Sequence, residues 1–351
     1  VLIQSGLRKH WKKKSRYHIE RIGCRVKLKK SWSRRETEIR HSDRIMLLGS
    51  CFAENIGNLL LANKFRCDVN PFGILYNPLS IVEALWQILS HQTYTEEDLF
   101  YAGGCWHSWM HHSVFSASTA ASCLSSINTR LEQASAGLPQ LDWLVITWGT
   151  AFAYWLKERT MVVGNCHKQP DSLFTRQLLT VEEIVTEWEC VLVELRKVNP
   201  FLKILFTVSP IRHSKDGMHG NQISKSTLLL AVDELCRRWS DCYYFPSYEI
   251  MMDELRDYRF YADDMLHPSP VAVSYLWECF TECYFSKETD RIMKEWEDIR
   301  KALAHKPFNA QSETYRKFLT QIVLKIERLK EKFPYFDLQK ELEQCQARLK
   351  I

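Results

Sequence analysis

The sequence predicts a three-layer α/β sandwich, with helices on both faces of a parallel sheet of roughly five strands. Short aliphatic and β-branched runs alternate with longer segments of helical periodicity, a pattern typical of strands joined by crossover helices. At 351 residues, 46% of them hydrophobic, the chain is long enough to bury a domain-sized core. The runs with the strand pattern are Ile45–Leu48, Trp143–Trp148, Ile204–Val208 and Tyr243–Phe245.

The first strand leads through a Gly-Ser turn directly into a helix. Apolar residues recur at helical spacing after Gly49-Ser50, which predicts a helix from about Ala53 to Asn63. Lys64–Val69 is the candidate for the second strand, and it leads into the loop Asn70-Pro71-Phe72-Gly73. The first half of the sheet is therefore expected to be a strand, a tight turn, a helix and a second strand.

Further helices are expected after the later strands and at the end of the chain. Proline or acidic residues at a first turn mark two of the starts. The expected helices cover residues 78–91, 180–198, 225–239, 287–303 and 312–333. The last two are charged and amphipathic and are joined by a Lys-Pro break, so we expect a C-terminal helical hairpin over 286–351, behind a main domain at 41–285.

Charge is concentrated in an N-terminal arm over residues 1–40. The arm holds 14 Lys and Arg against three Glu, a local +11, so the remaining residues carry about −6 of the net +5. We expect a disordered extension without a function of its own. The alternative is a basic tether that makes a weak contact with nucleic acid or an anionic membrane surface.

Composition also bears on location. The uncharged apolar runs are far shorter than the roughly 20 residues that cross a bilayer, so no membrane span is expected. The 12 cysteines are scattered and none form a Cys-x-x-Cys pair. We expect reduced thiols and a cytoplasmic protein.

Two local motifs carry residues suited to nucleophilic catalysis. Ser50 follows Gly49 at the end of a strand, where the amides of Ser50 and Cys51 open a helix and would favour a developing oxyanion. Asp264-Met265-Leu266-His267 places a carboxylate three residues before an imidazole, which it could orient as a base. Serine is also among the best helix N-caps, so a purely structural role for Ser50 stays open.

These motifs resemble those of a known family. Gly49-Ser50-Cys51-Phe52-Ala53-Glu54-Asn55-Ile56-Gly57 resembles the motif that names the GSCFA domain family, which is grouped with the SGNH (GDSL-like) hydrolases. The resemblance covers about residues 42–285. Further matching stretches are Asn70-Pro71-Phe72-Gly73, Tyr76-Asn77-Pro78, Ile146-Thr147-Trp148-Gly149-Thr150-Ala151, Asn165-Cys166-His167-Lys168, Ser209-Pro210-Ile211-Arg212 and Asp264-x-x-His267.

The resemblance implies a flavodoxin-like α/β/α fold with a serine hydrolase site. By position, Ser50 would be the nucleophile, His267 the base and Asp264 the orienting carboxylate. The oxyanion would be bound by the amides of Ser50 and Gly73. The superfamily's third block supplies an asparagine, where this chain has Gly149-Thr150, so Thr150 or Asn165 is expected to replace it.

Several polar residues are candidates for contacting substrate. They are His111, His112, His167 and Arg212, which lie in loops expected at the catalytic edge of the sheet. Their spacing does not favour a metal site, because no cysteine or carboxylate lies close to the histidines. Neither a metal nor an organic cofactor is expected.

The sequence thus favours a serine esterase or acyltransferase that acts on a small-molecule or glycan acyl ester. The competing interpretation is a non-catalytic carbohydrate-binding or scaffold protein on the same fold, in which the atypical third block records a lost oxyanion hole. A third interpretation is an interaction protein that uses the basic arm or the C-terminal helices.

Overall fold

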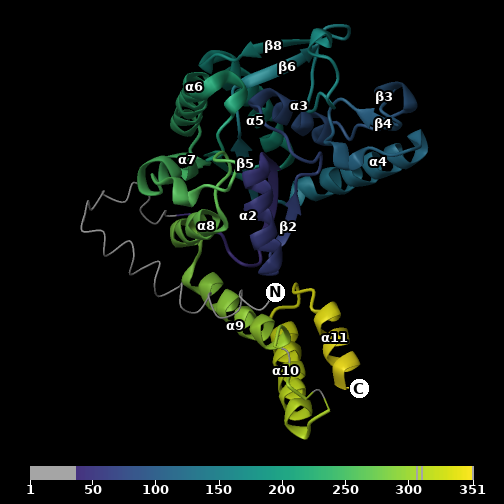
Figure 1. Ribbon diagram of the computed structural model, residues 1–351, viewed down its shortest axis with the longest axis vertical. Coiled ribbons are helices and arrows are strands. Elements are labelled where there is room, and N and C mark those ends of the chain that lie inside the picture. Colours follow the sequence, from purple (N-terminus) through teal and green to yellow (C-terminus); the bar gives the residue numbers. More distant parts are fainter. Residues whose placement is uncertain (1–36, 306, 310, 350–351) are drawn as a thin grey trace.

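The computed structural model describes residues 37–305, 307–309 and 311–349 (Figure 1). Nearly all of the basic arm predicted for residues 1–40 lies outside these ranges, and with it the predicted disorder and the alternative of a tether.

The centre of the molecule is a five-stranded parallel sheet in the order β10-β9-β5-β1-β2. The strands are β1 (Arg44–Gly49), β2 (Arg66–Val69), β5 (Trp143–Trp148), β9 (Lys203–Val208) and β10 (Cys242–Phe245). Numbered along the chain, these strands are arranged 2-1-3-4-5, the order of flavodoxin-like folds. The structure therefore confirms the predicted fold class and the five predicted strands.

Helices cover both faces of this sheet (Figure 1). One face packs against α2 (Cys51–Ala62) and α8 (Pro270–Tyr284). The other packs against α3 (Pro78–Leu89), α4 (Ala120–Gly137), α5 (Val181–Val198) and α6 (Gly217–Arg238). Because strand side chains alternate, Ile45 and Leu47 enter the first layer, while Met46 and Leu48 enter the second.

Some elements were not expected from the sequence. They are helix α4, the hairpin β3 (Leu99–Ala102) and β4 (Cys105–Ser108), the sheet of β6 (Phe152–Leu156), β7 (Met161–Val162) and β8 (Phe174–Leu178), and the short α7 (Ser247–Glu249). Helix α6 begins at Gly217, eight residues before the predicted start at Lys225. Its first turns contain two glycines and mostly polar residues, which conceal the helical pattern.

The C-terminal region contains three helices, so the predicted hairpin was incomplete. Helices α9 (Lys287–Leu303) and α10 (Glu313–Lys332) are the expected pair, and α11 (Gln339–Leu349) adds a third. They share a hydrophobic cluster of their own, separate from the two cores beside the sheet. The Trp296 indole donates to the carbonyl of Ala62 at 2.8 Å and thereby fastens α9 to the end of α2.

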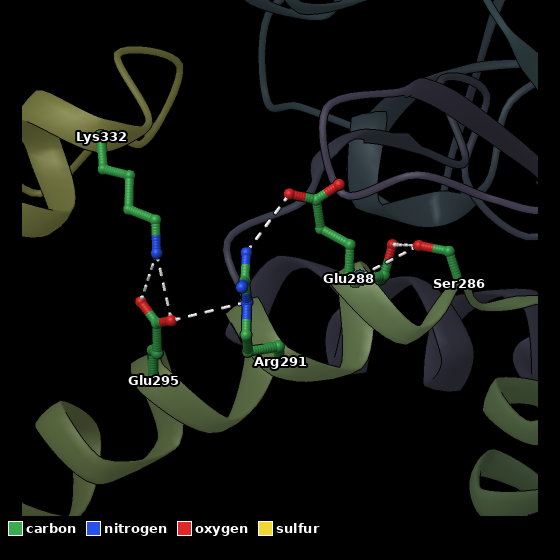
Figure 2. A network of polar contacts seen from close by, with 6 residues as sticks. Ser286, Glu288, Arg291, Glu295 and Lys332 are labelled. Atoms are coloured by element: carbon green, nitrogen blue, oxygen red, sulfur yellow. Dashed lines mark hydrogen bonds and ion pairs between the residues drawn. The ribbon is translucent and has the colours of Figure 1, made fainter.

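Polar contacts supplement this helical cluster (Figure 2). Ser286 caps α9 by accepting a 3.0 Å hydrogen bond from the Thr289 amide. Lys332 of α10 lies 3.2 Å from a Glu295 carboxylate oxygen on α9, and Arg291 contacts Glu288 at 3.4 Å. These pairs are exposed, so they contribute little stability compared with the apolar contacts beneath them.

Candidate functional site

Gly49 forms the turn after β1, at a position where any side chain would clash with the neighbouring strand. Gly49 has φ +143°, and a Cβ built there would lie 2.2 Å from the carbonyl oxygen of Thr147 on neighbouring β5. The Gly49 amide donates to Asn70 Oδ1 at 3.0 Å, and its carbonyl accepts from the Leu75 amide at 3.0 Å. The turn is thus held by both adjacent segments, which fixes the position of the following Ser50.

Ser50 is the N-cap of α2 and is 1% exposed. Its Oγ accepts a 3.3 Å hydrogen bond from the Phe52 amide, while its own amide donates to the Thr147 carbonyl at 3.1 Å. Ser50 therefore has the helix-capping role that the sequence left open. Within the described ranges, no hydrogen bond joins Ser50 to His267.

Asp264 and His267 form a hydrogen-bonded pair. Asp264 Oδ2 lies 2.5 Å from His267 Nδ1, and Oδ1 accepts the amides of Leu266 and His267, each at 2.9 Å. The hydrogen bonds from the His267 and Leu266 amides, together with that from the imidazole, favour the carboxylate and lower the Asp264 pKa to about 2. If the imidazole donates Nδ1–H to Asp264, its basic lone pair is on Nε2.

The pair and Ser50 lie at the same edge of the sheet. The Arg212 amide, just beyond β9, donates to the Leu266 carbonyl at 3.2 Å and anchors the loop that carries the pair. Helix α8 begins three residues after His267 and packs on the same sheet face as α2, which begins after Ser50. Both helices start at the carboxyl ends of the strands, where ligands bind in open α/β sheets.

The amides predicted to bind an oxyanion already have acceptors. The Gly73 amide donates to the Asn70 carbonyl at 2.7 Å, and the Thr150 amide donates to the Tyr76 carbonyl at 3.0 Å. Thr150 Oγ1 lies 3.1 Å from Ser224 Oγ. In this structure, therefore, neither Gly73 nor Thr150 directs an unpaired amide toward Ser50.

Asn165 lies in a loop that packs on the strand β4 region. Its amide donates to the Trp109 carbonyl at 3.0 Å, and its Oδ1 accepts the His167 amide at 2.8 Å. His167 Nε2 lies 2.8 Å from the Ser108 carbonyl oxygen, and burial lowers the His167 pKa. These hydrogen bonds therefore stabilise the loop that contains Asn165 and His167.

The remaining predicted contact residues differ in accessibility. His111 is 1% exposed and stacked on Phe72 at 4.6 Å, and burial lowers its pKa to about 3. His112 is half-buried, with its Cβ where a side chain on Gly73 would lie. Of the two histidines, His112 is thus the one that borders the Gly73 loop and solvent.

Arg212 is half-buried beside the loop that carries Asp264 and His267. Its guanidinium lies 4.1 Å from the Tyr261 ring centroid and 5.6 Å from that of Tyr258. No carboxylate pairs with it within the described ranges. Its charge is therefore available to an anionic group that reaches this edge.

A buried lysine that was not anticipated from the sequence supports the loops at the same edge of the sheet. Lys225 is 1% exposed, and its Nζ donates to the carbonyls of Gly149 at 2.6 Å and Ser209 at 2.7 Å, linking the loops after β5 and β9. Burial lowers its pKa to about 7. The available signal was its spacing with Leu228, Val232 and Leu235, which places it on the buried stripe of α6.

Lys225 makes stability depend on pH. Between about 7 and its usual pKa of 10.5, the unfolded chain binds a proton at this residue that the folded chain does not. The free energy of unfolding of wild type, relative to Lys225→Met, is therefore expected to rise as pH increases through this window. Urea unfolding at pH 7, 8.5 and 10 measures this, and a difference that is constant or falls with pH would contradict the assignment.

Two kinds of feature were not found among the described residues. They contain no cluster of three His, Cys, Asp or Glu side chains arranged to hold a metal ion. None of the helices that the structure describes has the length and apolar character needed to span a membrane.

Comparison of the sequence with models of known protein families gives two matches. The model of the GSCFA family matches residues 44–280, which include the Ser50 turn and the Asp264–His267 pair. A second model, of the GSCFA domain protein C-terminal domain, matches residues 296–351, where the separate helical cluster lies. A search of curated proteins found no matching relative. The chain therefore belongs to the GSCFA family.

Proposed function

We propose that this protein is a serine esterase or acyltransferase of the SGNH-hydrolase type. The observation that carries the proposal is the 2.5 Å contact of Asp264 with His267 at the sheet edge where Ser50 opens α2. A carboxylate that orients an imidazole near a strand-end serine is the arrangement needed to activate a hydroxyl nucleophile.

In the proposed reaction, Ser50 Oγ attacks the ester carbonyl carbon as His267 Nε2 accepts the hydroxyl proton. The tetrahedral intermediate then expels the alcohol, which takes that proton from His267. Water or a second alcohol then attacks the acyl-enzyme and gives its proton to His267, which passes the proton to Ser50 Oγ as the acyl product leaves. Asp264 stays ionised throughout, because its pKa of about 2 lies far below physiological pH.

The proposed substrate is an acyl ester of a small molecule or carbohydrate, handled in the cytoplasm without a cofactor. Half-buried His112 and the unpaired Arg212 border the candidate site and supply polar contacts for such a substrate. Arg212 would suit a substrate that also carries a carboxylate or phosphate.

The burial of Ser50 favours a second candidate function. Ser50 is 1% exposed and serves as a helix cap, as it would in a protein that binds carbohydrate or acts as a scaffold without catalysis. The short Asp264–His267 contact argues for the enzyme, because a helix cap does not require a paired base elsewhere on the same edge.

Replacing Asp264 by asparagine tests the proposed role of the pair. We expect kcat for a short-chain p-nitrophenyl ester to fall by roughly 10²- to 10⁴-fold, since the imidazole loses its orienting charge. Asp263→Asn is the matched control, because it removes the same charge from an exposed neighbour that makes no contact with His267. Equal activity of both variants and wild type would refute the role of Asp264.

A further inference from the structure

Asn70 has a buried donor without a partner beside the candidate nucleophile. The residue is 8% exposed, and its Oδ1 accepts the Gly49 amide at 3.0 Å. Its Nδ2 is buried and has no hydrogen-bond acceptor among the residues that the structure describes. A buried N–H group without an acceptor is costly, so its retention calls for an explanation.

The orientation of this carboxamide follows from its neighbour. Gly49 presents an N–H, which requires the oxygen of Asn70 and not its nitrogen. The amide nitrogen is therefore the unpaired end, and because the carboxamide is small and planar, Nδ2 lies close to the turn that carries Ser50.

The backbone of Asn70 is equally constrained. Its amide donates to the Leu47 carbonyl at 2.8 Å, and its carbonyl accepts from the Gly73 amide at 2.7 Å. Its φ of +46° is in the left-handed region, which asparagine adopts more readily than most residues. Two backbone hydrogen bonds thus hold the residue and one holds its side chain before any substrate binds, as electrostatic catalysis requires.

A second unpaired donor lies beside Ser50. The amide of Cys51, the first residue of α2, makes no hydrogen bond within the described part of the chain. The helix dipole adds positive potential at this position. In contrast, the amides of Ser50, Gly73 and Thr150 each donate to a backbone carbonyl.

We propose that Asn70 Nδ2 and the Cys51 amide form the oxyanion hole. This inference rests on the proposed esterase function. As the bond from Ser50 Oγ to the carbonyl carbon forms, the carbonyl π electrons move to oxygen, and these two donors bind the resulting oxyanion. The side-chain donor thus comes from the loop after β2, and it compensates for Gly149-Thr150 in the loop after β5.

Asn70→Asp tests this role, because aspartate keeps the acceptor for Gly49 and replaces the nitrogen donor with an oxygen. We expect kcat for the p-nitrophenyl ester to fall by about 10²- to 10³-fold with KM nearly unchanged. Affinity for a trifluoromethyl ketone, which forms a tetrahedral oxyanion on the serine, should fall by a similar factor. Affinity for the corresponding methyl ketone should not change.

Two further variants separate catalysis from folding. Asn63→Asp alters an equally buried asparagine at the far end of α2, where Nδ2 already donates to the Leu59 carbonyl at 2.7 Å, and should leave kcat unchanged. Asn70→Gly tolerates the positive φ and removes both side-chain groups, so it should reduce kcat even if Asn70→Asp does not fold.

The outcomes distinguish this inference from the proposed function. An active wild type whose folded Asn70→Asp or Asn70→Gly variant keeps kcat and ketone affinity within about threefold would overturn the oxyanion role alone. A wild type that is inactive toward esters and does not bind the trifluoromethyl ketone would overturn both proposals.

Discussion

Replacing Ser50 by alanine is expected to lower kcat/KM for a short-chain p-nitrophenyl ester by at least about 10³-fold, because the acyl-enzyme can no longer form. The fold should survive, since the substitution removes only one cap hydrogen bond, from the Phe52 amide at 3.3 Å. Loss of such a cap costs about 1 kcal/mol of stability. Ester hydrolysis and urea unfolding, measured on the same preparation, would separate the two effects.

Ser286→Ala is the matched control for this experiment. Ser286 caps α9 with a 3.0 Å bond from Thr289 (Figure 2). It follows the C-terminal end of α8, whereas Asp264 and His267 precede the N-terminal end of that helix. Its removal should cost a similar amount of stability and leave hydrolysis intact. If Ser50→Ala and Ser286→Ala retain equal activity, Ser50 is only a helix cap. That result would favour a non-catalytic carbohydrate-binding or scaffold protein.

Gly49→Ala is expected to have the largest effect on stability. The new Cβ would meet the Thr147 carbonyl oxygen at 2.2 Å, on a backbone with φ +143°. Overpacking and backbone strain each cost about 1–3 kcal/mol, so the free energy of unfolding should fall by about 2–6 kcal/mol. Urea or guanidinium unfolding measures this, and activity should fall as well because the turn positions Ser50.

Gly137→Ala provides the comparison for the glycine change. Gly137 ends α4, and an added Cβ there would meet no atom within 4 Å. Alanine in this helical position should leave stability unchanged or raise it by up to about 1 kcal/mol. Equal unfolding midpoints for the two variants would show that β1 and β5 do not approach at Gly49 as described.

The parallel sheet could be predicted because its signal is local. Strands such as Trp143–Trp148 are buried on both faces and appear in the sequence as continuous apolar runs. Helix α4 gives a weaker signal: its buried Cys123, Ile127, Leu131 and Ala134 recur at helical spacing, but they are few, and serines and other polar residues lie between them. The antiparallel strands β6 to β8 are too short for periodicity to reveal, and β8 pairs with β6 across a long loop.

In the candidate site, too, local contacts could be predicted from the sequence and long-range ones could not. The Asp264–His267 contact was predictable because three residues on one turn suffice to make it. The unpaired nitrogen of Asn70 was not predictable, because its pairing depends on which acceptors the fold brings close to that side chain. For the same reason, the sequence could not show that the Thr150 amide already donates to the distant Tyr76 carbonyl.

Reaction with a fluorophosphonate, followed by intact mass and peptide mapping, tests most directly whether Ser50 is an activated nucleophile. We expect one adduct on folded wild type, located at Ser50 and absent from Ser50→Ala. A folded wild type that forms no adduct, or an equal adduct on Ser50→Ala, would contradict the role of Ser50 as nucleophile.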